Sequence, residues 1–69
     1  MTVTAVVYYE SESKLFVAEC PQIGTASQGA TEEEALANLK EATELYLESF
    51  PDAFPKTEAH VTTLNLSYA

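Results

Sequence analysis

The sequence predicts an α+β domain in which one helix packs on one face of an antiparallel sheet, in the order β-β-β-α-β. Three observations lead to this prediction. Two runs of β-branched and aromatic residues near the N-terminus are separated by a short polar break. A capped segment with a hydrophobic period of 3.6 follows them, and a last strand-like run comes near the end of the sequence. With 69 residues the chain has the length of one domain, so we assign residues 1–69 to a single domain.

The first two predicted strands form a hairpin. Residues 3–9 read VTAVVYY and residues 14–20 read KLFVAEC, with the polar run ESES between them. A polar break of this length is typical of a hairpin connection. In the second strand Phe16, Ala18 and Cys20 share one face that is wholly apolar, so we predict that this face lies against the core. Pro21 lacks the backbone donor that a ladder needs, and it ends the strand.

A short third strand is predicted over residues 24–29 (GTASQG), and a helix follows it. Thr31 is a good N-cap and Glu34 lies three residues further on, which is the arrangement of a capping box. Pro51 ends a helix of roughly 18 residues. The apolar stripe of this helix consists of Ala35, Leu36, Leu39, Ala42, Thr43, Tyr46, Leu47 and Phe50.

The last predicted strand, residues 57–68, changes its pattern partway along. Val61 lies on one face, whereas Leu64, Leu66 and Tyr68 lie on the other. The change indicates either a bulge or a strand whose two faces are both covered near its end. Coverage on both faces would be natural at a subunit interface.

The charge of the chain favours some partners over others. Eleven acidic residues and three lysines give a formal net charge of −8. Affinity for nucleic acid comes largely from Lys and Arg side chains that neutralise phosphates, so we expect no direct nucleic-acid binding. The same acidity serves solubility, and it would speed the encounter with a basic protein partner.

The small size of the chain predicts self-association. A chain of 69 residues is only marginally able to offset its conformational entropy. Cys20 is the only cysteine, which excludes an internal disulfide, and with His60 it makes too few soft ligands for a structural zinc ion. We therefore expect a homodimer or a higher homo-oligomer.

The sequence also bears on the location of the protein. No stretch approaches the roughly 20 apolar residues of a membrane span. Without a signal-peptide pattern, and with one unpaired cysteine, the expected location is the cytoplasm.

Residues that could carry catalysis are scarce. The sequence has no phosphate-binding loop, no dinucleotide-binding glycine pattern and no pair of cysteines. Cys20 and His60 are the only nucleophile and base of their kinds, and Cys20 belongs to the apolar set of a strand, where cysteine behaves as a small hydrophobe. Glu44 and Glu48, one helical turn apart, would hold a cation weakly without further oxygen ligands. We predict no catalytic residue, no cofactor and no metal, and hence a protein that is not an enzyme.

Several motifs together resemble those of the HicB-type antitoxin domain. The resemblance covers residues 3 to about 49 and rests on a strand ending in a proline, a turn, a cap and a helix pattern. The matching stretches are FVAECP at residues 16–21, SQGAT at 27–31, EAL at 34–36, NLKEA at 38–42 and LYLE at 45–48.

This resemblance implies a partial ribonuclease-H-like core and a partner. HicB-like domains bind and block HicA, a small basic ribonuclease with a fold like that of double-stranded-RNA-binding domains. Full-length relatives also carry a C-terminal DNA-binding domain, and they oligomerise. Because this sequence ends at Ala69, we expect a stand-alone domain that lacks the DNA-binding part. It departs from the family at residues 21–24 (PQIG), where relatives have a further proline, and at Thr25, where many have cysteine.

Three functions remain open at this point. The first is a protein-binding module that neutralises a HicA-type ribonuclease by direct binding. The second is an orphan HicB-like domain that self-associates and has no toxin partner. The third is a residual metal-dependent nuclease, which would need several carboxylates converging on two metal ions. For the partner-binding surface we predict an acidic rim formed by Glu10, Glu12 and Glu19, which flank the first hairpin away from the helix-covered face.

Overall fold

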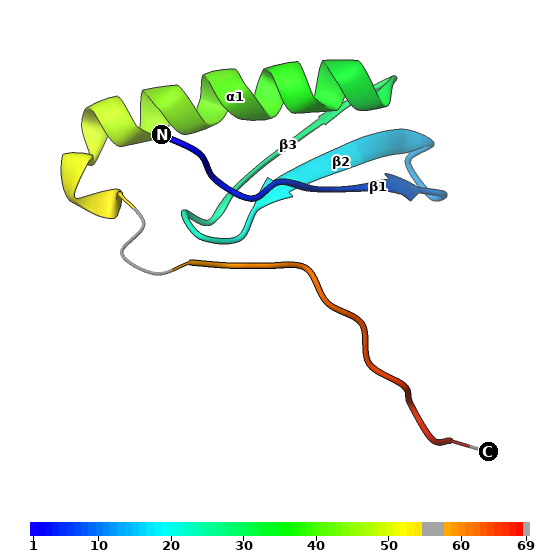
Figure 1. Ribbon diagram of the computed structural model, residues 1–69. Helices are drawn as coiled ribbons and strands as arrows, with labels where there is room; N and C mark the ends of the chain where they lie inside the picture. Colours follow the sequence, from blue (N-terminus) through cyan, green and yellow to red (C-terminus); the bar gives the residue numbers. More distant parts are fainter. Residues whose placement is uncertain (55–57, 69) are drawn as a thin grey trace.

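The computed structural model describes residues 1–54 and 58–68 and consists of two layers, a three-stranded sheet and one helix (Figure 1). The α+β class predicted from the sequence is confirmed. The strands are β1 (Val6–Glu10), β2 (Leu15–Cys20) and β3 (Thr25–Gly29). Helix α1 spans Glu32–Ser49, and a short 3-10 helix, η1, spans Pro51–Ala53.

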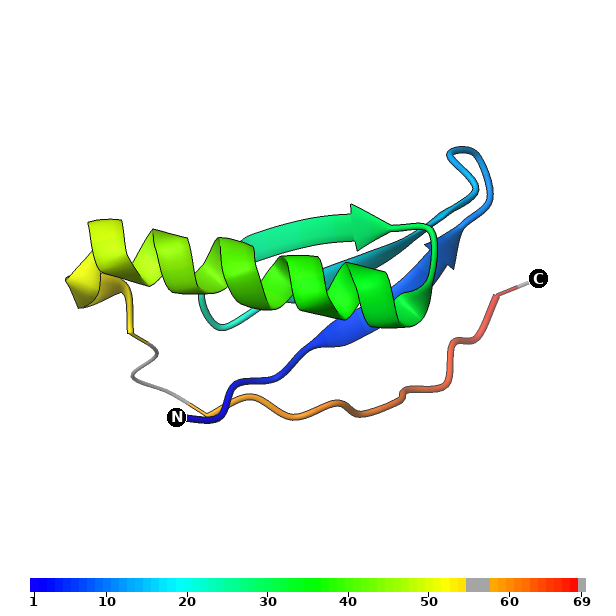
Figure 2. The same ribbon diagram turned by 90° about the horizontal axis from the view of Figure 1, so that it is seen from above.

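The sheet has the order β1-β2-β3, and both pairs of strands are antiparallel. Ala18 lies opposite Val7 on one side and opposite Ser27 on the other. Seen from above, α1 runs across one face of this sheet (Figure 2). Ala18 and Cys20 are only 0% and 1% exposed, so the apolar face predicted for the second strand does lie against the core.

Strand β1 begins at Val6, three residues later than predicted. The pairing with β2 would place Thr4 opposite Pro21, which has no N–H to offer to a ladder. The backbone N–H of Thr4 instead donates to the side-chain oxygen Oε1 of Gln22 at 2.7 Å. Residues 1–5 therefore form an arm that leads into β1 without belonging to the sheet.

The N-terminus of α1 is capped as predicted. The backbone N–H of Glu34 donates to Oγ1 of Thr31 at 3.0 Å. The return bond of the capping box is shifted by one residue, because Oε1 of Glu34 accepts from the N–H of Ala30 at 3.2 Å. Three glutamates in the first turn place negative charge at the positive end of the helix dipole.

Helix α1 contacts the sheet through small residues. Ala35 and Leu39 are buried with Ala18 and Cys20 in a core cluster. A Cβ atom at Gly29 would lie 2.6 Å from the backbone N of Ala35, so only glycine permits the present approach of β3 and the helix.

Two aromatic residues at the far end of the predicted apolar stripe are exposed. Tyr46 is 39% exposed and Phe50 is 57% exposed. An 18-residue helix is about 27 Å long, whereas strands of five or six residues extend only about 17–20 Å. The last turn of α1 therefore passes beyond the sheet, and the rings of Tyr46 and Phe50 pack on each other with centroids 4.9 Å apart.

The predicted fourth strand is not formed in this chain. Residues 58–68 are exposed and contain no strand, while Thr57 lies outside the described residues. A strand needs a neighbour for its backbone groups, and this segment runs away from the sheet (Figure 1). Near its start, Oγ1 of Thr4 donates a hydrogen bond to the carbonyl oxygen of Ala59, at 3.1 Å. The observed order is therefore β-β-β-α, followed by an extended segment.

Candidate partner-binding surface

One face of the sheet lies opposite the helix, and we call it the open sheet face. Alternation along the strands and the pairing register define its members. Within residues 1–54 and 58–68, no second layer covers this face, because the C-terminal segment is itself exposed. The open sheet face consists of Val6, Tyr8, Glu10, Leu15, Val17, Glu19, Ala26 and Gln28.

Apolar and aromatic side chains occupy the centre of the open sheet face. Val6 is 37% exposed and Tyr8 is 43% exposed, and Val17, directly opposite Tyr8, is partly buried. These side chains are adjacent across the β1–β2 ladder, where cross-strand neighbours lie within contact of one another. The result is a continuous half-exposed apolar strip with an aromatic ring in it.

Tyr8 is linked to an acidic side chain on the same face. Its phenol O–H donates a hydrogen bond to Oε1 of Glu19 at 3.2 Å. The hydrogen bond to the Glu19 carboxylate raises the pKa of Tyr8 above its ordinary value, with smaller contributions from desolvation and from the negative charges of Glu19 and Glu10. The phenol therefore stays neutral, and the carboxylate keeps its other lone pairs free for a donor from outside.

The three glutamates predicted as an acidic rim do not form one cluster. Glu10 ends β1 beside the hairpin loop, and Glu12 lies within that loop. Glu19 pairs with Val6 at the other end of the ladder, so four residues, or about 13 Å of strand, separate it from the level of Glu10. Glu10 and Glu19 nevertheless share the open sheet face, one near each end of the apolar strip.

Sequence reasoning missed Tyr8 and Val6 as members of this surface. The signal was present, because alternation places both on the face opposite to the apolar set of Phe16, Ala18 and Cys20 once the hairpin register is known. The register itself depends on the hairpin loop. There Lys14 has a φ of 60°, and its N–H bonds to the carbonyl oxygen of Glu10 at 2.9 Å.

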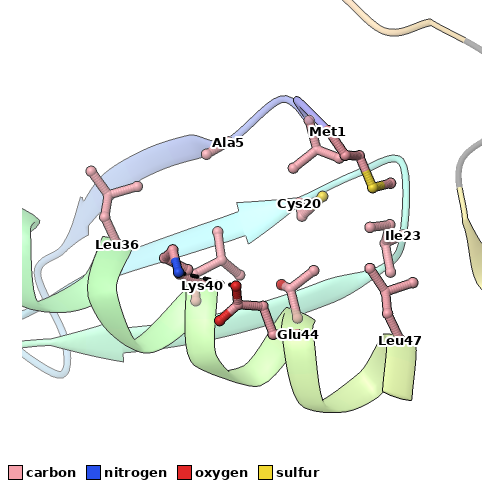
Figure 3. Close-up of a pocket in the computed structure, with 11 residues that line it drawn as sticks. Met1, Ala5, Cys20, Ile23, Leu36, Lys40, Glu44 and Leu47 are labelled. Carbon is pink, nitrogen blue, oxygen red and sulfur yellow. Dashed lines mark hydrogen bonds and ion pairs between the residues drawn. The ribbon is translucent and has the colours of Figure 1, made fainter. Parts of the chain in front are cut away.

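A second concave feature lies on the helix side of the sheet, and we call it the arm groove. It is a cavity of about 410 Å³ between residues 1–5, the end of β2 and helix α1 (Figure 3). Its lining is mainly apolar and includes Val3, Ile23, Leu36 and Leu47. At its rim Nζ of Lys40 forms an ion pair with Oε2 of Glu44, at 3.0 Å.

The residues singled out for chemistry lie in different surroundings. Cys20 is buried in the core and borders the arm groove, whereas His60 is exposed in the C-terminal segment. In the part of the chain that the structure describes, there is no group of three or more His, Cys, Asp or Glu side chains placed to hold a metal ion. Among the same residues, no helix combines the length and the apolar character that crossing a membrane requires.

Comparison with known proteins identifies no relative of this chain. No protein-family model, no curated protein and no solved structure shows a significant match to it.

Proposed function

We propose that this chain is a protein-binding module whose open sheet face binds a small basic protein. The observation that carries the proposal is the pairing of Tyr8 with Glu19 on a half-exposed apolar strip. Tyrosine supplies a large contact area at low entropic cost, and interfaces are enriched in it. A carboxylate held beside the ring supplies an acceptor for Lys or Arg on a partner.

The distribution of charge supports a basic partner. The formal net charge is −8, and the acidic residues are spread over the hairpin, the first turn of the helix and its outer side. A surface of one sign raises the rate of encounter with a partner of opposite sign, an effect that salt screens. A phosphate backbone would meet repulsion from the same field.

In its sharper form, the proposal is that the partner is a HicA-type ribonuclease and that binding neutralises it. The motifs at residues 16–21, 27–31 and 34–48 support this form, because they resemble the HicB-type antitoxin domain. Binding here is stoichiometric inhibition: the acidic module covers the basic surface with which the ribonuclease holds RNA.

The test uses the full chain and a purified small basic HicA-type ribonuclease. RNA cleavage is measured with increasing amounts of the chain, and affinity is measured by calorimetry at low and at moderate salt. The expected result is loss of cleavage at an equimolar ratio and weaker binding as salt rises. Full cleavage in the presence of excess chain at micromolar concentration would overturn the HicA form.

Variants locate the interface. Tyr8→Ala is expected to weaken binding by about tenfold or more, as truncation of an aromatic anchor does. Glu19→Gln is expected to weaken binding more than the loss of a distant charge does, because the Glu19 carboxylate accepts directly from Lys or Arg of the partner. Glu48→Gln removes one charge from the helix and serves as the matched control. Equal effects of Glu19→Gln and Glu48→Gln would show that the open sheet face is not the binding surface.

A further inference from the structure

The C-terminal segment carries four of the five most exposed large apolar side chains of the described residues, the fifth being Met1. Val61, Leu64, Leu66 and Tyr68 are 72%, 76%, 77% and 90% exposed. Exposing several neighbouring apolar side chains of this size to water costs free energy, and soluble proteins usually bury such patches. Covering these side chains requires an apolar surface, and no such surface of the described residues lies against them.

After Glu58 the segment contains no Asp, Glu, Lys or Arg. All eleven acidic residues and all three lysines lie at or before Glu58. Two copies of a chain with a net charge of −8 repel each other over most of their surfaces. Residues 59–69 contain no Asp, Glu, Lys or Arg, so this stretch can approach a second copy with less of that repulsion.

The pattern of the segment is that of an amphipathic strand. Leu64, Leu66 and Tyr68 alternate with Asn65 and Ser67, so an extended backbone places the apolar side chains on one side and the polar ones on the other. The backbone of such a strand can pair with a free sheet edge. Its apolar side chains can then fill a hollow on one side of the sheet, while its polar side chains face the other side.

Both features occur along residues 1–10, because the arm groove borders the arm that leads directly into β1. Strand β1 is at the edge of the sheet, and among residues 1–54 and 58–68 it pairs only with β2, so no described strand lies against its outer backbone groups. The groove next to it holds about 410 Å³ and is lined by Val3, Leu36 and Leu47 among others. Met1, Ile23 and Leu47 lie together at one end of this hollow, and Leu36 lies at its other end (Figure 3).

We propose that the C-terminal segment of one copy lies along β1 of a second copy and places Leu64, Leu66 and Tyr68 in its arm groove. The exchange is reciprocal, so that each chain fills the groove of the other and the pair has twofold symmetry. Each sheet gains a fourth strand, and the polar side of that strand, with Asn65 and Ser67, joins the open sheet face.

The course of the segment favours a second copy over the same chain. The Thr4–Ala59 hydrogen bond holds the start of the segment beside the arm, yet residues 61–68 then leave the sheet rather than turn back onto it (Figure 1). The Cα radius of gyration is 13.9 Å. A compact chain of this length would have about 11 Å. The chain is thus more extended than a compact domain of its length, and its own core is small.

The first test is the mass of the full chain in solution, measured by sedimentation equilibrium. The expected mass is twice the 7.5 kDa of one chain. Leu66→Asp is expected to weaken the dimer by about 100-fold, because two segments each lose roughly one tenfold factor or more. Asn65→Asp adds the same charge one residue away without removing an apolar side chain, and it is expected to leave most of the dimer intact. A monomer for the unmodified chain, or equal effects of the two variants, would overturn the proposal.

The second test separates exchange between chains from closure within one chain. Labelled and unlabelled full-length chains are mixed, and isotope-filtered NMR detects contacts between methyl groups of different chains. Contacts of Leu64 and Leu66 with Val3 and Leu36 are expected between chains. The same contacts seen only within a chain would show that the segment folds back on its own groove. Circular dichroism of each variant confirms that α1 is still formed, so a loss of dimer is not mistaken for unfolding.

The outcome does not depend on the proposed toxin partner. A dimer with exchanged segments that leaves the ribonuclease active would support the self-association alone. A monomer that inhibits the ribonuclease would support the proposed function alone.

Discussion

Tyr8 donates a hydrogen bond to the Oε1 atom of Glu19 across the β1–β2 ladder, at 3.2 Å. The two residues are diagonal neighbours, because Tyr8 pairs with Val17 and Glu19 pairs with Val6. This contact joins the aromatic and acidic parts of the open sheet face, and it makes the ionisation of Tyr8 a reporter of Glu19.

Replacement of Glu19 by Gln is expected to lower the pKa of Tyr8 toward its ordinary value of 10.0. The carboxylate raises the pKa of Tyr8 mainly by accepting its hydrogen bond, and an amide oxygen accepts less strongly and carries no charge. NMR titration of labelled tyrosine measures the change. Glu48→Gln removes the same charge elsewhere, so a similar shift in that variant would contradict the assigned cause.

The same contact predicts a pH dependence of stability in the alkaline range. The pKa of Tyr8 is raised in the folded state, so folding favours the protonated phenol. The contribution is therefore complete below the pKa of the unfolded chain and is lost as the pH rises through the folded pKa. Urea midpoints of the unmodified chain and of Tyr8→Phe are expected to converge as the pH rises through that range. A difference that grows with pH would have the wrong sign for this contact.

The hydroxyl pair of Thr25 and Thr43 predicts a measurable coupling. Their Oγ1 atoms lie 2.7 Å apart, and Thr43 is only 8% exposed. Thr43→Val leaves the hydroxyl of Thr25 without this partner, and each single change to Val is expected to cost about 1 kcal/mol or more. The double change removes both polar groups and is expected to cost less than the sum. Urea unfolding of the four proteins gives the coupling, and additive costs would show that the hydroxyls do not act together.

Much of the fold could be predicted from the sequence, because the local preferences of these residues agree with their positions in the folded structure. The cap at Thr31, the stop at Pro51 and the apolar set of Phe16, Ala18 and Cys20 are each determined by short-range chemistry, and each is found in the structure. The third strand followed from the glycines that bound residues 24–29, and it spans Thr25–Gly29.

The strand predicted near the C-terminus is not formed within the described part of this chain, for a physical reason. Alternating apolar residues show that a segment suits a sheet, but they do not show that a neighbouring strand is available. The candidate site was also only partly accessible. Glu10 and Glu19 were chosen by charge, whereas the role of Tyr8 depends on which residue lies beside it across the ladder, and that is a property of the register.

The helix cap predicts a loss of stability when its side chain is removed. Oγ1 of Thr31 accepts from the N–H of Glu34, and Thr31→Ala leaves that donor without its side-chain acceptor. The expected cost is about 0.5–2 kcal/mol, measured as a lower urea midpoint. Glu34→Gln keeps a side-chain acceptor at the position of the return bond and is expected to cost less. A Thr31→Ala variant as stable as the unmodified chain would exclude a stabilising cap.

The close approach of β3 and α1 predicts that Gly29 tolerates no side chain. A Cβ atom there would lie 2.6 Å from the backbone N of Ala35 and 2.9 Å from atoms of Glu34. Because the nearest obstacle is backbone, it cannot move as the tip of a side chain does, and the helix N-terminus must shift. Gly29→Ala is therefore expected to destabilise the fold by about 1–3 kcal/mol. Gln28→Ala serves as the control: Gln28 is exposed, and it is the carbonyl oxygen of Gln28 that accepts from Nδ2 of Asn38. Equal urea midpoints for the two variants would show that a side chain at residue 29 does not disturb the packing of the helix against β3.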